Sequence, residues 1–213
     1  MKLFSLFIAL MLNAAILPGL LAQECFVAGE KIVVNWKAFK TPKKVGVSGS
    51  FDDVMMHLEH NNTAAPMAQI LQGRTVTINT QSVNSGNPER DAKLVNSFFK
   101  MMSGDQITAK IMEADENTIK VSIMLNGKTR EVSMDYHYAQ ETNTTVANGT
   151  IDLLDFAADG PLASINKACY DLHEGKTWSD VVIGFELPVS AVACPGKKEE
   201  KLSEEPDIIP HSI

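Results

Sequence analysis

Hydrophobic and polar residues alternate along much of this chain, as they do in β-strands that bury one face. The alternation predicts eight strands, at residues 31–38, 45–58, 74–80, 107–111, 119–125, 132–138, 146–156 and 181–187. The apolar positions alternate and do not form continuous runs, which favours an antiparallel sheet with one face toward solvent. The chain is therefore expected to be mainly β.

The second predicted strand changes phase in its middle. Up to Phe51 the apolar residues occupy every second position, and after Asp52-Asp53 they shift by one residue. The apolar residues before and after the shift are Val45, Val47, Gly49 and Phe51, and then Val54, Met56 and Leu58. A slip of one residue within a continuous strand is what a β-bulge produces, and bulges bend strands at barrel corners. We therefore predict a bulge at Asp52-Asp53.

Short turns join most of the predicted strands. Asn126-Gly127 is a strong signal for a type I′ hairpin turn, and residues 115–117 supply another turn. Short helices are expected at residues 64–71, from Pro88 onward, and at residues 161–173. Eight antiparallel strands that close on themselves leave no open edge and can enclose one small ligand. The predicted fold class is an eight-stranded antiparallel, lipocalin-like barrel with a few short helices in the connections.

Both ends of the chain differ from its middle. Residues 1–22 combine Lys2, an apolar run and the small residue Ala22, and they read as a secretory signal peptide. Residues 23–194 form the predicted barrel domain, and the Lys-, Glu-, Ser- and Pro-rich residues 195–213 are expected to be a disordered charged tail. We expect a periplasmic or secreted protein without stable membrane insertion after signal cleavage.

Three cysteines in an exported chain leave one thiol over when a single disulfide forms. Cys25 precedes the first predicted strand and Cys194 follows the last, and in a closed antiparallel barrel these two strands are neighbours. A Cys25–Cys194 bridge would therefore join the two ends of the domain. Cys169 lies on a predicted helix and suits a buried free thiol, with a Cys169–Cys194 bridge as the alternative pairing.

Composition and motifs give little support to catalysis, metal binding or nucleic-acid binding. The formal net charge is −7, and no basic cluster with interleaved aromatic residues is present, which argues against nucleic acid. Residues 46–50 fall one glycine short of a nucleophile elbow and lie within a predicted strand. His57 and His60 would point to opposite faces of a strand. We expect neither an enzyme nor a protein that needs a cofactor or a metal.

Three Asn-x-Ser/Thr tripeptides begin at Asn61, Asn143 and Asn148. Such tripeptides accept glycans in some exported proteins, and they also occur by chance in polar loops. We favour chance, and the sequence alone does not decide whether Asn61 or Asn143 is modified.

The most specific motif lies in residues 79–99. A strand that ends in polar residues leads into a Ser/Asn/Gly turn, and Arg90-Asp91, Leu94 and Phe98-Phe99 follow. Residues 44–51 contain a Val-x-Gly-x-Phe segment, and residues 165–181 supply a last helix and the start of a final strand. In their order and spacing these segments resemble the YceI-like family of small periplasmic lipid-binding barrels, over residues 32 to about 190.

The resemblance implies a carrier that shields the tail of an amphiphilic lipid, such as a polyisoprenoid or an isoprenoid quinone, for storage or transport. The residues expected to line the apolar interior are Trp36, Val47, Phe51, Ile78, Ile111, Val121, Ile123, Met134, Tyr136, Ile183 and Phe185. Arg90 is expected to tether the preceding turn, with contact to a lipid head group as the alternative. A filled barrel that contacts a partner without holding a ligand is the rival interpretation, followed by an enzyme. The sequence does not identify the lipid, its head group or the oligomeric state.

Overall fold

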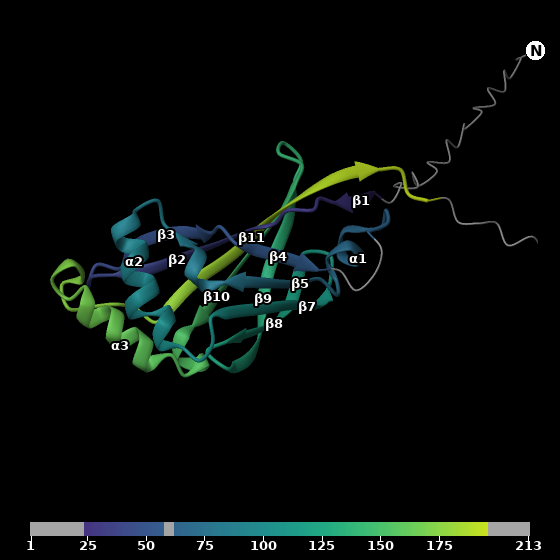
Figure 1. The fold of residues 1–213 in the computed structure, drawn as a ribbon. Helices are drawn as coiled ribbons and strands as arrows, with labels where there is room; N and C mark the ends of the chain where they lie inside the picture. Colours follow the sequence, from purple (N-terminus) through teal and green to yellow (C-terminus); the bar gives the residue numbers. More distant parts are fainter. Residues whose placement is uncertain (1–23, 58–61, 196–213) are drawn as a thin grey trace, which may run out of the picture.

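The computed structural model describes residues 24–57 and 62–195, which form a curled antiparallel sheet with a few short helices (Figure 1). In chain order the elements are β1 (Cys25–Ala28), β2 (Val33–Lys40), β3 (Val45–Phe51), β4 (Val54–His57), α1 (Met67–Leu71), β5 (Thr75–Asn79), the 3-10 helix η1 (Thr80–Ser82), β6 (Val83–Asn84), α2 (Pro88–Ser97), η2 (Phe99–Met101), β7 (Gln106–Ala114), β8 (Thr118–Leu125), β9 (Lys128–Ala139), β10 (Thr144–Asp152), η3 (Leu153–Phe156), α3 (Asp159–Ala168), η4 (Asp171–His173) and β11 (Asp180–Val192). The predicted fold class, mainly antiparallel β with short helices in the connections, is confirmed.

The sheet closes through the chain itself. Its strand order is β4-β5-β7-β8-β9-β10-β11-β2-β3-β6, and β1 pairs with β11 outside this path. β3 leads into β4 and β5 leads into β6, while β4 pairs with β5 and β3 pairs with β6. The strand order therefore begins and ends with the same two chain segments, β3–β4 and β5–β6, which pair with each other at both ends. When each continuous pair counts as one bent strand, eight strands run around the curl in the described part of the chain, as predicted.

The strand formed by β3 and β4 bends at Asp52 and Asp53, where the sequence predicts the bulge. The backbone N–H of Asp52 donates to the carbonyl of Ser82 at 3.0 Å, and the N–H of Asn79 donates to the carbonyl of Asp53 at 3.1 Å. Backbone pairing therefore continues across the bend. On the inner face, Val47 and Phe51 before the bend and Val54 and Met56 after it are at least half-buried, so the strand turns a corner without exposing this face.

The predicted hairpin turns are present, whereas some helix bounds differ from the prediction. Asn126 and Gly127 have φ angles of 51° and 67°, which both central positions of a type I′ turn require. The strand predicted to reach residue 156 ends at Asp152, because its side chain accepts a hydrogen bond from the N–H of Leu154 at 2.9 Å and begins η3. The helix predicted at residues 161–173 is divided into α3 and η4.

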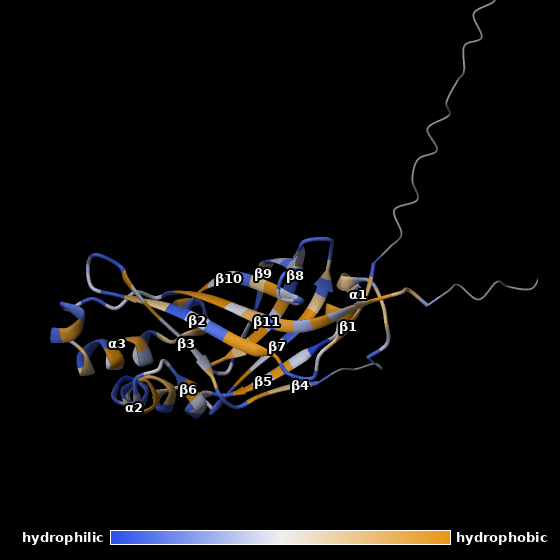
Figure 2. Cartoon of the chain, turned by 90° about the horizontal axis from the view of Figure 1, so that it is seen from above, coloured by the Kyte–Doolittle hydropathy of each residue, from blue (hydrophilic) through white to orange (hydrophobic). Residues whose placement is uncertain are grey.

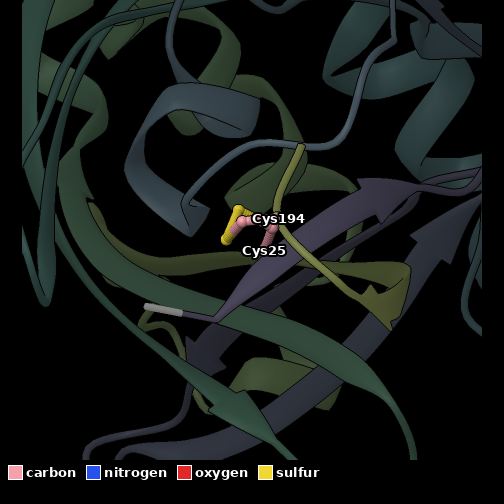
Figure 3. Close-up of a disulfide and its surroundings, with 2 residues drawn as sticks. All are labelled: Cys25 and Cys194. Atoms are coloured by element: carbon pink, nitrogen blue, oxygen red, sulfur yellow. A yellow bond between two sulfur atoms is a disulfide. The ribbon is translucent and has the colours of Figure 1, made fainter. Parts of the chain in front are cut away.

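A short strand that the sequence does not predict, β1, joins one end of the domain. β11 continues past its predicted end at residue 187 to Val192, and β1 pairs with this extension. A disulfide joins Cys25 to Cys194, the first of the two pairings considered (Figure 3). Cys169 is a buried free thiol. The bridge fastens the first and last described segments to each other beside the β1–β11 pair.

The two ends of the curled sheet are covered differently. α2 and α3 lie together at one end, whereas α1 and β1 lie at the other (Figure 1). Hydrophobic and hydrophilic residues alternate along the strands, as expected for a sheet that buries one face (Figure 2). Leu71 of α1 and Phe156 of η3 are among the most deeply buried residues, so helices from both ends contribute to the core.

Several predictions concern residues that the structure does not describe. The predicted signal peptide at residues 1–22 lies outside the described residues, as do His60, Asn61 and all but the first residue of the predicted tail at 195–213. Within residues 24–57 and 62–195, no helix is long and apolar enough to cross a membrane.

Replacing both bridged cysteines, Cys25→Ser together with Cys194→Ser, is expected to lower the free energy of unfolding by about 5 kcal/mol, because the bridge spans 169 residues of the unfolded chain. Denaturant unfolding followed by tryptophan fluorescence measures the change. Wild-type protein held in reductant is the control and should unfold at the same denaturant concentration as the variant. A clear difference between the two would show that the substitutions act through something other than the lost bridge.

Candidate functional site: an apolar space with a basic rim

Two adjoining cavities lie inside the curled sheet. The wide cavity has a volume of about 180 Å³ and lies beneath α2 and α3, and the narrow cavity of about 110 Å³ reaches toward α1. The residues that line both cavities are Trp36, Phe51, Ile107, Leu125, Ile151 and Ile183. Shared walls make the two cavities neighbouring parts of one apolar space. The interior of the sheet is therefore bounded by its side chains but not filled by them.

Most of the predicted lining residues do face this space. Val47 lines the wide cavity, and Trp36, Phe51 and Ile183 line both. The predicted residues that line only the narrow cavity are Ile78, Ile111, Val121, Ile123, Met134 and Phe185. They occupy alternate positions on five strands, so the period-two pattern of the sequence places them on the inner face.

Tyr136 differs from the other predicted lining residues. It is buried but lines neither cavity. Its hydroxyl donates to the backbone carbonyl of Asp115, which belongs to the turn between β7 and β8. Burial raises the pKa of this hydroxyl, and the Asp115 carboxylate adds to the effect. Tyr136 therefore holds a turn in place at the edge of the sheet.

Two helices supply a wall of the wide cavity that strand alternation does not predict. α2 begins after Asn87, whose Oδ1 accepts a hydrogen bond from the N–H of Arg90 at 3.0 Å, and Pro88 occupies its first turn. The apolar residues that α2, α3 and their ends turn toward the cavity are Leu94, Phe98, Leu162, Ile165 and Cys169. Their spacings of three and four residues put them on one face of each helix.

The Arg-Asp pair holds the turn that precedes α2. Arg90 donates from Nε to the hydroxyl of Ser85 at 2.7 Å and from Nη2 to the carbonyl of Ser85 at 2.8 Å. Asp91 accepts hydrogen bonds from the N–H of Ser85 at 2.9 Å and from its hydroxyl. Arg90 has the tethering contacts expected from the sequence, and it also lines the wide cavity.

Trp178 closes the wall where the β2–β3 hairpin meets the start of β11. Its Nε1 donates to the carbonyl of Thr41 at 2.8 Å, and its backbone N–H donates to the carbonyl of Phe39 at 3.1 Å. The Nζ atoms of Lys44 and Lys176 lie 5.0 Å and 4.6 Å from the centroid of its ring. Trp178 thus joins the β2–β3 hairpin to the segment that precedes β11, and it lines the wide cavity. Sequence reasoning missed it because it lies between the alternating patterns.

The basic residues in the wall of the wide cavity gather at the helical end of the sheet. They are Lys40 of β2, Arg90 and Lys93 of α2, and His173 of η4. Lys40, Lys93 and His173 are half-buried, so the wide cavity reaches the surface at this rim. No Asp or Glu among the described residues lines either cavity.

A chain of hydrogen bonds fixes the tautomer of His173. Asn166 donates from Nδ2 to the carbonyl of Gly175 at 3.3 Å, so its Oδ1 accepts the hydroxyl of Thr177 at 2.9 Å. The Thr177 oxygen then accepts a hydrogen bond from Nδ1 of His173 at 2.7 Å. The network therefore assigns the proton of the neutral ring to Nδ1 and leaves Nε2 as an acceptor.

The surroundings of His173 favour its neutral form. Burial lowers its pKa, and the positive charges of Lys40 and Lys93 lower it further. At the end of a helix the dipole favours a histidine cation, but the burial and the positive neighbours of His173 oppose it. The residue ends η4 among basic neighbours.

Arg74 is the charged residue of the narrow cavity and is 1% exposed. Its Nε donates to the carbonyl of Ile70, its Nη2 donates to Oδ1 of Asn62 at 3.2 Å, and its Nη1 lies 3.6 Å from the sulfur of Met56. Burial lowers its pKa, because removing the guanidinium from water disfavours the cation. Arg74 ties α1 to β4 at the end of the sheet opposite the basic rim.

Within the described part of the chain, no group of three His, Cys, Asp or Glu residues could hold a metal ion. His57 is exposed at the end of β4, and His60 lies outside the described residues. The interior therefore offers apolar contact with a few basic groups at its rim.

His173 should make the protein less stable as the pH falls. Its pKa in the folded state lies below the usual 6.5, so the unfolded state binds the proton first and the stability present above pH 6.5 is lost as the pH falls through the folded value. We expect the free energy of unfolding to fall less between pH 7 and pH 5 in His173→Gln than in wild type. The exposed His137→Gln is the matched control, and equal pH dependence in the two variants would contradict the assignment.

Comparison with known proteins places this fold in a family. The YceI-like domain matches residues 28–190. A polyisoprenoid binding domain from Saccharophagus degradans, implicated in plant cell wall breakdown, superposes with a TM-score of 0.52 at 13% identity, covering 80% of this chain and 99% of that domain. BcnA from Burkholderia cenocepacia superposes with a TM-score of 0.51 at 19% identity, covering 75% of this chain and 96% of that protein.

No curated protein sequence matches the chain. The solved structures are similar in fold, and the domain match spans most of the chain, from the end of β1 to the last residues of β11. The chain therefore belongs to the YceI-like family.

Proposed function

We propose that this protein holds an amphiphilic lipid of the polyisoprenoid or isoprenoid quinone type, with the tail inside the curled sheet and the head group at the helical end. The observation that carries the proposal is the two-part apolar space whose basic residues gather at one rim. The protein acts as a carrier or store and not as an enzyme. Arg74, at the opposite end, is engaged by backbone and side-chain acceptors.

The size of the space supports binding of an apolar chain. An engineered apolar cavity of about 150 Å³ stays free of water and binds benzene. The wide cavity alone, at about 180 Å³, is larger, and the narrow cavity adjoins it. At about 0.8 kcal/mol per buried carbon, one five-carbon isoprene unit gains about 4 kcal/mol, so a short length of tail offsets the cost of association.

Similarity to other proteins and features of the sequence support the same proposal. One structure with this fold is described as a polyisoprenoid binding domain. The Cys25–Cys194 bridge suits an oxidising compartment, and residues 1–22 read as a secretory signal. We propose that the protein acts in the periplasm or outside the cell, where a lipid must cross an aqueous space.

Native mass spectrometry of mature protein from its exporting host, followed by organic extraction, tests the proposal. We expect a stoichiometric apolar ligand that leaves only on denaturation. Protein without a ligand that also takes up no added isoprenoid quinone or farnesol would contradict the carrier function and favour a ligand-free interaction module.

A pair of neighbouring residues provides a matched test of the lining. Ile123 is 5% exposed and faces the narrow cavity, whereas Met124, the next residue of β8, is 43% exposed. Ile123→Arg should abolish lipid binding because it buries a charge in the apolar space, and Met124→Arg should retain it.

A second variant, which fills part of the wide cavity, tests the binding site if Ile123→Arg does not fold. Ala38→Phe adds a ring at the wall of the wide cavity without burying a charge, and it should lower lipid occupancy in a folded protein. Full occupancy in folded Ile123→Arg or Ala38→Phe protein would place the lipid elsewhere.

A further inference from the structure

The rim of the wide cavity carries charge of one sign only. Its charged wall residues are Lys40, Arg90 and Lys93, and no carboxylate of the described residues faces the space. The whole chain carries a formal net charge of −7, so this positive rim is not a reflection of the overall composition. A cavity that held only a hydrocarbon would gain no affinity from these positive charges.

Lys40 and Lys93 approach the cavity from different elements. Lys40 is the last residue of β2, and Lys93 lies on α2, yet both are half-buried in the wall of the same cavity. Side chains of this kind place their carbon stems against apolar surface and their ammonium groups at its edge. The two lysines therefore mark the point where the apolar space meets water.

The other basic groups of this region already have partners. Lys44 pairs with Asp180 at 2.7 Å and lies over the ring of Trp178, and Lys176 lies over the same ring. Arg90 is held by Ser85. Among the described residues, Lys40 and Lys93 form no ion pair.

Lys40 and Lys93 place two positive charges at one rim, where a further cation is disfavoured. Burial is the main cause of the lowered pKa of His173, and both lysines lower this pKa further through their positive charges. An anion bound at this rim would offset the two positive charges and gain charge-assisted hydrogen bonds. A neutral hydroxyl or quinone would leave both positive charges without a counterion.

We propose that the lipid held by this protein has an anionic head group, a phosphate or carboxylate on a single hydrocarbon chain, which Lys40 and Lys93 bind at the rim of the wide cavity. This inference rests on the proposed lipid-binding function and specifies the chemistry of its ligand. Arg90, fixed on Ser85, adds a third positive charge to the same rim. The apolar walls beneath hold the chain that follows the head group.

The two tryptophans of the chain provide the readout, since Trp36 and Trp178 both line the wide cavity. Delipidated mature protein is titrated with farnesyl monophosphate and with farnesol, which share a tail and differ in head-group charge. We expect the phosphate to bind at least about tenfold more tightly, a difference of about 1.4 kcal/mol. The preference should shrink as sodium chloride is raised, because salt screens exposed charges.

Charge-matched variants assign the preference to the two lysines. Lys40→Gln with Lys93→Gln should remove most of the preference, because the affinity for farnesyl monophosphate falls further than the affinity for farnesol. Lys43→Gln with Lys100→Gln removes the same charge from residues that do not line the cavity, and it should keep the preference. Inorganic phosphate should not displace farnesyl monophosphate at equal concentration.

The outcomes separate this inference from the function on which it rests. Equal affinity for the two ligands, or equal loss in the two variants, would overturn the anionic head group and leave lipid binding intact. Displacement by inorganic phosphate would show an anion site that does not recognise the chain, and would also overturn it. Failure of both ligands to bind would overturn the proposed function together with the inference.

Discussion

The structure depends on the pairing of two strands that bend at the same place. β3–β4 and β5–β6 stay hydrogen-bonded across Asp52 and Asp53, and only through them do the two ends of the sheet order meet. Side chains support the bend: Asn79 donates from Nδ2 to Asp53 at 3.1 Å, and Asn84 donates to Asp52 at 3.0 Å. Because the sheet closes on itself, its inner face packs against no second layer. The interior space is a direct result of that closure.

The helices give the space its shape and its chemistry. Phe99 of η2 packs edge-on against Phe51 of β3 with ring centroids 6.0 Å apart, and against Phe98 at 5.1 Å. These contacts seat α2 on the bent strand, and α3 packs beside it. The same arrangement brings Lys93 and His173 to the rim. The apolar packing that holds the two helices on the sheet therefore also determines where these basic side chains lie.

Features that depend on the burial pattern within one strand could be predicted from the sequence. Features that depend on contacts between distant segments could not. Ile123 and Phe185 could be assigned to the inner face because each strand alternates by itself, and the bend could be read from a slip of one residue. Trp178 could not be placed, because its position depends on hydrogen bonds to the β2–β3 hairpin far away in sequence. Tyr136 fits the alternation, yet its hydroxyl binds the Asp115 carbonyl and its ring stays out of both cavity walls. β1 is four residues long and becomes recognisable only through its pairing with β11.

The disulfide lies at one end of the sheet and the helical rim lies at the other. The two ends therefore differ in how firmly they are held. The end with β1 is fastened by a bond that thermal motion does not break, whereas α2 and α3 are held by side-chain packing and hydrogen bonds. Opening of the helical end is a local event that leaves the strand ladder intact, and local opening costs less free energy than global unfolding. The lipid that we propose as ligand would then enter and leave a molecule that stays folded. For such a ligand, the rate of exchange would depend on how firmly α2 and α3 are held against the sheet, and not on the stability of the sheet itself.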